Sequence, residues 1–275
     1  MNFERTLEQV VQQTNLSMLK PDKNTLQSPR NLRELRARLP KLASPSDAKF
    51  LQRYFKTAPG EYGAGDQFIG IRVPVLRKLA KEFRSLPLRE VTALLRSPIH
   101  EERLLALLIL VDTYHRADET GRAAIYKLYL NNLDHINNWD LVDGSAPRIV
   151  GRHLAQRPRA VLFRLARSKI VWHRRAAVLA TFYFIRQDDF ADALHLAELL
   201  RDDEHDLMHK AVGWMLREIG KRDVSALKQF LQQHAALMPR TMLRYAIEKL
   251  PERERRRYLQ AGRTGAARIV AAKLS

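Results

Sequence analysis

Apolar side chains recur at helical spacing through most of the chain, with polar residues between them. The clearest example is VPVLRKLAKEF, residues 73–83, in which Val75, Leu76, Leu79 and Phe83 share one face of a helix. Pro74 suits the first turn of that helix, where its N–H is not needed. No stretch alternates β-branched and polar residues as a half-buried strand does. The pattern predicts an all-α protein in which helices of about 10 to 18 residues are separated by short breaks.

The breaks between these helices recur at regular intervals. They contain LLRSPIHEER, YLNNLDHINNWD, LARSKIVWHRR, LLRDDEHDLMHK and AALMPRTMLRYA, and a helical stretch follows each one. Equivalent points are 36, 35, 34 and 36 residues apart, at Arg96, Asn132, Arg167, Arg201 and Leu237. A period of this size is typical of stacked helix pairs that bury their apolar faces against their neighbours. We therefore expect an α-solenoid, because a compact helical bundle has no reason to repeat in this way.

The first 30 residues differ from the rest of the chain. They are polar, are broken by Pro21 and Pro29, and lack a sustained apolar period. We expect residues 1–30 to form a flexible extension and residues 31–275 to form one repeat domain. No apolar run is long enough for a signal-peptide core or a membrane span. A cytoplasmic protein without membrane contact is expected.

The charge and the residue types narrow the possible partners and chemistry. Lys and Arg number 48 against 30 Asp and Glu, a formal net charge of +18, so a polyanion such as nucleic acid is the favoured partner. The absence of cysteine excludes disulfides, thiolate zinc sites and cysteine nucleophiles. His205 and His209 have the spacing of metal ligands, but no third ligand is fixed and the motif HExxH is absent. No metal site is predicted.

The segment NNWDLVDGSAP, residues 137–147, places acidic residues beside a tryptophan in this basic chain. In a helix Trp139 and Asp143 lie one turn apart on the same face, whereas Asp140 points elsewhere. A purely structural alternative makes Trp139 a core residue and Asp143 the start of an Asp-Gly turn, with Pro147 ending or kinking the helix. These residues alone leave both interpretations open.

Two later helices add candidate contacts for an anion. Arg175 shares an apolar stripe with its neighbours in SKIVWHRRAAVLATFYF, so its guanidinium requires a carboxylate or a phosphate as partner. In DLMHKAVGWMLREIGK, Trp214 falls outside the core stripe, on the face of Lys210, Arg217 and Lys221. An indole on a basic face is better explained by contact with nucleic acid than by burial. The core stripe of that helix comprises Met208, Val212, Met215 and Ile219.

Four separated motifs together resemble a known family. NWDLVD, WHRRAA, KAVGWMLRE and RTMLRYAIEKLP, in this order and at these distances, are similar to the bacterial DNA alkylation repair glycosylases of the AlkD family, over about residues 32–260. The resemblance implies HEAT-like helical repeats with a basic concave groove for duplex DNA. It also implies hydrolysis of the N-glycosidic bond of cationic alkylated purines, namely 7-methylguanine and 3-methyladenine.

The same resemblance implies roles for individual residues. Asp143 matches the catalytic aspartate, Trp139 and Trp214 match two DNA-facing tryptophans, and Arg175 matches a phosphate-contacting arginine. Arg72, in YGAGDQFIGIR, stands where the best-known members have glutamine, and it joins the predicted DNA contacts. Lys210 and Arg217, which share the predicted face of Trp214, complete the set of predicted DNA contacts.

The chemistry implied by the resemblance is consistent with one carboxylate in a basic protein. A purine alkylated at N7 or N3 is cationic and leaves without a general acid, while a fixed carboxylate stabilises the oxocarbenium-like sugar and orients water. We therefore expect a monofunctional, metal-free and cofactor-free glycosylase that acts as a monomer on alkylated double-stranded DNA. The alternatives are a non-catalytic binder of damaged or branched DNA on the same fold, and a protein-binding scaffold without salt-dependent DNA affinity.

Overall fold

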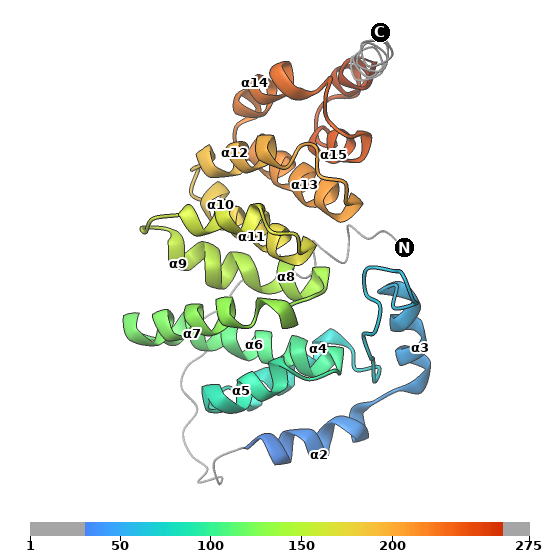
Figure 1. Cartoon of the computed structure of the whole chain (residues 1–275), viewed down its shortest axis with the longest axis vertical. Coiled ribbons are helices and arrows are strands. Elements are labelled where there is room, and N and C mark those ends of the chain that lie inside the picture. The colour runs from blue at the N-terminus through green and yellow to red at the C-terminus, as the bar shows by residue number, and fades with distance from the viewer. Residues whose placement is uncertain (1–30, 261–275) are drawn as a thin grey trace. The chain divides into compact units, whose positions relative to one another are not determined.

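The computed structural model describes residues 31–260, and every regular element in that range is helical (Figure 1). The predicted all-α class is thereby confirmed. The one β-type contact among the described residues is an isolated bridge between Gln67 and Ile99. The expected extension of residues 1–30 lies outside the described range, as do residues 261–275. Within the range, the chain divides into two compact units, which meet in sequence at Ser145 and Ala146.

The first unit, called unit 1, contains the helices up to the Trp139 segment. Its elements are α2 (Leu32–Leu42), α3 (Pro45–Tyr54), α4 (Val73–Glu82), α5 (Leu88–Leu95), α6 (His100–Arg116), α7 (Glu119–Asn131), the 3-10 helix η1 (Leu133–His135) and α8 (Trp139–Ala146), whose last residue lies past the boundary.

The second unit, called unit 2, continues the same alternation. Its elements are the π-helix η2 (Pro147–Gly151), α9 (Arg152–Leu154), α10 (Ala160–Ala166), α11 (Val171–Ile185), α12 (Ala191–Leu199), α13 (Asp206–Arg222), α14 (Val224–His234) and α15 (Arg240–Ala246), followed by a helical stretch over residues 252–260.

The regular breaks in the sequence separate the two helices of successive pairs. Arg96, Asn132 and Arg167 are the C-cap residues of α5, α7 and α10. Arg201 follows Leu200, the C-cap residue of α12, and Leu237 lies in the turn between α14 and α15. In unit 2, α10 packs on α11 and α12 packs on α13 (Figure 1). The period of 34 to 36 residues is therefore that of a helix pair, as the predicted repeat requires.

Helix α4 shows how the apolar pattern determines the local structure. It begins at Val73 with Pro74 in its first turn. Leu76, Leu79 and Phe83 are buried, while Val75, at the edge of the stripe, is half-buried. The predicted helix and its buried face are both confirmed for this element.

Several second helices of the pairs are covered by more than one neighbouring element. Helices α6 and α11 bury residues on all sides, because each packs against several neighbouring elements. Helix α13 contacts α11 and α15 as well as α12 and α14. At Gly213 the approach to α15 is so close that a Cβ atom would lie 2.5 Å from the carbonyl oxygen of Met242. A residue on such a helix is covered by neighbours that its own sequence does not reveal.

None of the described helices is both long and apolar enough to cross a membrane. Residues 31–260 likewise contain no cluster of three or more His, Cys, Asp or Glu side chains arranged to hold a metal ion. His205 instead precedes α13 and its Nδ1 accepts a hydrogen bond from the Leu207 N–H at 3.2 Å. His209 bonds through Nε2 to the carbonyl oxygen of Asp203.

Candidate active site and nucleic-acid contacts

The start of α8 is fixed by polar side chains on both sides of Trp139. Asn138 accepts a hydrogen bond from the Trp139 N–H through Oδ1 at 2.8 Å, and donates from Nδ2 to Asp66 Oδ2 at 3.0 Å. Asp140 accepts from the Leu141 N–H at 2.9 Å. An acidic residue in the first turn also interacts favourably with the helix dipole. These contacts hold the segment that carries Trp139 and Asp143.

A buried histidine joins two of these carboxylates. His100 Nδ1 lies 3.0 Å from Asp66 Oδ2, and His100 Nε2 lies 2.9 Å from Asp140 Oδ2. Arg103 donates from Nη2 to the other oxygen of Asp66. All of these side chains are buried or nearly so. We call His100, Asp66, Asp140 and Arg103 the His100 network.

The carboxylates determine the charge state of His100. Burial alone would lower the pKa of His100, but the charges of Asp140 and Asp66 and their hydrogen bonds raise it to about 9. Burial alone would raise the pKa of Asp66, but hydrogen bonding with His100 and the charges of His100 and Arg103 lower it to about 2. At neutral pH the imidazole is therefore protonated and donates from both nitrogens.

The His100 network accounts for Asp140 and was missed by sequence reasoning. Asp140 points away from Asp143, as its helical position predicts, and its partner comes from α6. Asp66, His100 and Asp140 are 34 and 40 residues apart, so no local motif links them. The one sequence signal for the role of His100 was the motif HEER at a break. This motif places His100 in the first turn of α6, the second helix of its pair.

Trp139 is enclosed by aromatic side chains of unit 1. It is 1% exposed, its ring stacks on Phe55 at 5.1 Å, and Tyr54 meets it edge-on at 6.0 Å. Burial raises the pKa of Tyr62 to about 12, and an interaction with the Trp139 side chain offsets part of the rise. The structural alternative, a core tryptophan, describes the position of the ring in this structure, while its role toward DNA stays a prediction.

Asp143 lies on the next turn of the same helix, as predicted. Its side chain is 0% exposed, and its charge adds to the burial that raises the pKa of Tyr129. The hydroxyl groups of Tyr129 and Ser145 are 2.9 Å apart. The alternative of an Asp-Gly turn is wrong, because the helix continues through Gly144 and widens into the π-helix that begins at Pro147. A π-helical turn accommodates a proline, which lacks an N–H, and such turns are frequent at functional sites.

Arg175 occupies the core of unit 2. It is 1% exposed and donates from Nη1 to the carbonyl oxygen of Leu207, at the start of α13, at 2.6 Å. The predicted setting, a guanidinium among apolar neighbours, is confirmed by its burial beside Val178 and Leu179. A carbonyl oxygen of α13 is one of its partners, which the sequence did not indicate.

Trp214 requires a correction, because the structure buries it rather than placing it on an exposed basic face. It is 4% exposed, its ring lies 5.8 Å from that of Phe182, and its Nε1 donates to Glu218 Oε1 at 3.0 Å. A single helix seen as a wheel has one buried stripe, but α13 is covered by α11 and α15 as well as by its pair partners. The polar side of α13 is therefore partly an interface.

The three other predicted cationic contacts all have acidic partners. Lys210 forms an i,i+4 ion pair with Asp206 at 2.7 Å and is half-buried. The remaining two are arginines. Arg217 is buried and paired with Glu248, whereas Arg72 is half-exposed, pairs with Asp47 and lies 5.3 Å over the ring of Phe50. Through its hydrogen bond and charge, Arg72 lowers the pKa of Asp47.

The repeat relates these charged residues to one another. The fifth residue is Asp143 in α8, Arg175 in α11, Lys210 in α13 and Arg244 in α15, while α6 has Leu104 there. Arg244 is exposed. Sequence reasoning missed it, although the spacing of the breaks was sufficient to find it. One carboxylate and three cations thus occupy the same repeat position.

Comparison with known proteins identifies the family. The family model of the DNA alkylation repair enzyme matches residues 35–250. A solved structure described as a predicted DNA alkylation repair enzyme from Enterococcus faecalis has a TM-score of 0.60 and 18% identity, covering 76% of this chain and 97% of that chain, and it supports the fold. No curated protein matches the chain. The chain therefore belongs to the DNA alkylation repair enzyme family, with a role in the repair of alkylated DNA.

Proposed function

We propose that the protein is a monofunctional DNA glycosylase that releases 7-methylguanine and 3-methyladenine from duplex DNA, with Asp143 as its catalytic carboxylate. The observation that carries the proposal is the repeat position of Asp143. It holds an acid where the next three second helices hold Arg175, Lys210 and Arg244. A carboxylate at this position in so basic a protein is suited to a developing positive charge, whereas the three cations are suited to phosphates.

The reaction requires little other machinery. The bond between C1′ and the purine nitrogen breaks, the electron pair leaves with the already cationic base, and the base departs neutral. The sugar then carries the positive charge, which the carboxylate of Asp143 stabilises while a water molecule adds to C1′ and loses a proton. Neutral lesions lack this leaving-group charge, so the proposal confines the activity to cationic bases.

The cations differ in how readily each can exchange its present partner for a phosphate of the DNA backbone. Arg244 is exposed, and Lys210 and Arg72 would exchange partly exposed ion pairs, which contribute about 0–1 kcal/mol each. Arg217 would have to leave Glu248 from a buried position, which costs more. We therefore assign the DNA backbone to Arg244, Lys210 and Arg72 ahead of Arg217, and assign Arg175 to a contact that depends on opening of its site.

Access to the lesion is a further requirement of the proposal. Trp139 and Asp143 are buried, and the side chains of Tyr54, Phe55 and Tyr62 pack on Trp139. The segment that carries these aromatic side chains must shift when DNA binds, so that the tryptophan face can meet the cationic sugar or base. The chain would act as a monomer, without a metal or another cofactor.

The experiment that tests this function is base release from methylated duplex DNA by the full chain. The released bases are identified by chromatography and mass spectrometry, with uracil-containing and hypoxanthine-containing duplexes as controls. Release of 7-methylguanine and 3-methyladenine without release of the neutral bases, and without strand nicking, supports the proposal. Tight binding without any release would instead favour the alternative, a non-catalytic binder of damaged or branched DNA on the same fold.

A further inference from the structure

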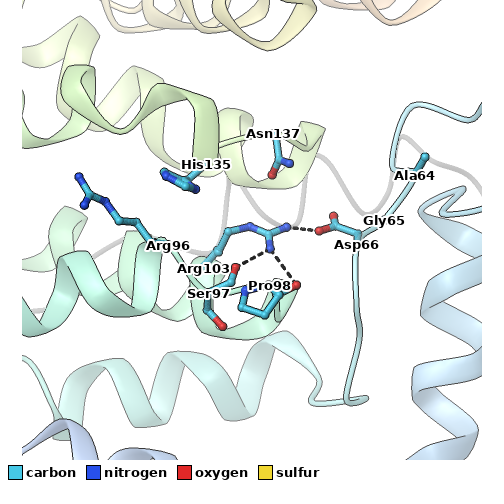
Figure 2. Close-up of a pocket in the computed structure, with 9 residues that line it drawn as sticks. All are labelled: Ala64, Gly65, Asp66, Arg96, Ser97, Pro98, Arg103, His135 and Asn137. Atoms are coloured by element: carbon cyan, nitrogen blue, oxygen red, sulfur yellow. Dashed lines mark hydrogen bonds and ion pairs between the residues drawn. The ribbon is translucent and has the colours of Figure 1, made fainter.

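A polar cavity of about 310 Å³ lies within unit 1 (Figure 2). Two consecutive repeat breaks form much of its wall, with Arg96 and Ser97 from the break after α5, and His135 and Asn137 from the break after α7. Arg103 crosses the cavity and its guanidinium points toward Asp66 on the opposite side (Figure 2). We call this cavity the Arg96 pocket.

The same arginine occurs in unit 2 with a different partner. Arg103 in α6 and Arg174 in α11 each donate from Nη1 to the two carbonyl oxygens of the break before their helix, at 2.9–3.1 Å and 2.9–3.0 Å. Arg174 also donates from Nε to a carboxylate oxygen of Asp203 at 2.6 Å. The buried Nε of Arg103 has no acceptor among residues 31–260, and the cavity lies beside this side chain. Both arginines therefore have a carboxylate partner, but Arg103 meets Asp66 through Nη2 only, and its Nε lacks the acceptor that Asp203 provides to Arg174.

A second guanidinium borders the same cavity. The Nε of Arg96 donates to Asn132 Oδ1 at 2.8 Å, which fixes the side chain. Its two terminal nitrogens have no hydrogen-bond or ion-pair partner within the described range. His135 lies between Arg96 and Asn137 along the wall (Figure 2). The amide of Asn137 has a buried Oδ1 without a partner in residues 31–260, and turning the amide over would present its Nδ2 donor instead.

Asp66, the one acidic residue in the wall, does not repel an anion in the cavity. Asp66 is compensated by Arg103 and by the protonated His100, and it also accepts from Asn138. The remaining wall groups supply two guanidinium groups, an imidazole and an amide. Planar guanidinium groups suit the oxygens of a phosphate, and a cavity without a second free acid does not suit a metal cation.

We propose that the Arg96 pocket binds one phosphate group, supplied by the backbone of a DNA strand. This inference rests on DNA being the substrate of the proposed function, but it is independent of base release. Its donors are the terminal nitrogens of Arg96 and the imidazole of His135. It adds a backbone contact in unit 1, at the breaks of the repeat, separate from the fifth-residue cations of unit 2.

The first arm of the test uses inorganic phosphate and the full chain. The imidazole signals of His135 are followed by ¹⁵N-edited NMR while phosphate is added, in the wild type, in Arg96→Gln and in Arg167→Gln. Arg167 is the matched control, because it is exposed and ends α10 as Arg96 ends α5. A saturable shift in the wild type and in Arg167→Gln, but not in Arg96→Gln, is expected. No saturable shift, or an equal one in Arg96→Gln, overturns the site.

The second arm measures the affinity for undamaged duplex DNA between about 50 and 200 mM salt. Arg96→Gln should weaken binding and lower the salt slope by about 1, whereas Arg167→Gln should leave the slope nearly unchanged. Equal slopes for the two variants overturn the DNA assignment. A phosphate shift at His135 with an unchanged slope identifies free phosphate as the source instead. Neither arm measures base release, so both results would stand even if the protein proved not to be a glycosylase.

Discussion

The helices α8 in unit 1 and α11 in unit 2 carry residues of opposite charge at the same repeat position. The fifth residue of α8 is Asp143, beside Tyr129, and the fifth residue of α11 is Arg175, bonded to the carbonyl oxygen of Leu207. Both are buried. The repeat thus fixes where the side chain lies, while the sign of its charge decides whether it suits a cationic sugar or an anionic phosphate.

The two helices are also anchored differently. The start of α8 is held by the His100 network, in which a protonated imidazole links Asp66 to Asp140. The start of α11 is held by Arg174, which bonds to Asp203 and to the break before the helix. A guanidinium keeps its charge at any relevant pH, but an imidazole does not. The anchor of the candidate catalytic helix is therefore the pH-sensitive one.

The largest effect is expected from removing the imidazole. His100→Ala leaves the carboxylates of Asp66 and Asp140 buried without the cation between them, which should lower the free energy of unfolding of unit 1 by about 3–5 kcal/mol. Chemical denaturation followed by circular dichroism measures this. Arg116→Ala removes an exposed ion pair from the same helix and should cost far less. Similar losses for the two variants would contradict a structural role for the network.

A somewhat smaller effect is expected at the buried tryptophan of unit 2. Trp214→Ala should lower the free energy of unfolding by about 3 kcal/mol, because the ring is buried and its Nε1 is bonded to Glu218. Trp214→Phe retains most of the apolar contact and should cost less. Thermal and denaturant unfolding give both values. An unchanged midpoint for Trp214→Ala would mean that the indole is exposed after all, as the sequence pattern predicted.

The pH dependence follows from the sign of the shift at His100. Its pKa in the folded protein is about 9, above the ordinary histidine value of 6.5, so the stabilisation is fully present below pH 6.5 and is lost as the pH rises through 9. The difference in free energy of unfolding between the wild type and His100→Gln should shrink by about 2 kcal/mol between pH 7 and pH 10. A constant difference over that range would contradict protonation of His100. Asp66, Asp140 and Arg103 are the charged groups that face it.

The smallest effect on stability is expected at Lys210. Lys210→Gln removes an i,i+4 ion pair that contributes about 0.2–0.5 kcal/mol, yet it should lower the salt slope of DNA binding by about 1. Arg256→Gln is the matched control, since Arg256 forms an exposed i,i+4 pair with Glu252. Fluorescence anisotropy with a labelled duplex measures both slopes. Equal changes would argue against the row of fifth-residue cations.

Much of the fold could be predicted because it depends on local spacing. The stripe of Leu76, Leu79 and Phe83 and the regular breaks are properties of neighbouring residues, and the structure has them as expected. The proximity of Trp139 and Asp143 was predictable for the same reason, because both lie on one helix.

What the sequence did not reveal depends on contacts between helices. A helical wheel treats one helix in isolation and therefore predicts an exposed face for Trp214. In the structure α13 is packed on several sides. The partner of Asp140 is His100, which lies 40 residues earlier and has no motif in common with it. The burial of Asp143 depends on the packing of unit 1 in the same way, so its accessibility could not be read from NWDLVD.

In the proposed reaction, the charge of Asp143 carries the chemical step. Asp143→Asn keeps the shape of the side chain and removes its charge, so 7-methylguanine release from a methylated duplex under single-turnover conditions should slow by about 100- to 1000-fold. DNA affinity should be retained, because a negative charge has left a site for a polyanion. Asp112→Asn, which removes an exposed carboxylate from α6, should leave the rate unchanged. A wild-type rate of release by Asp143→Asn would contradict the account.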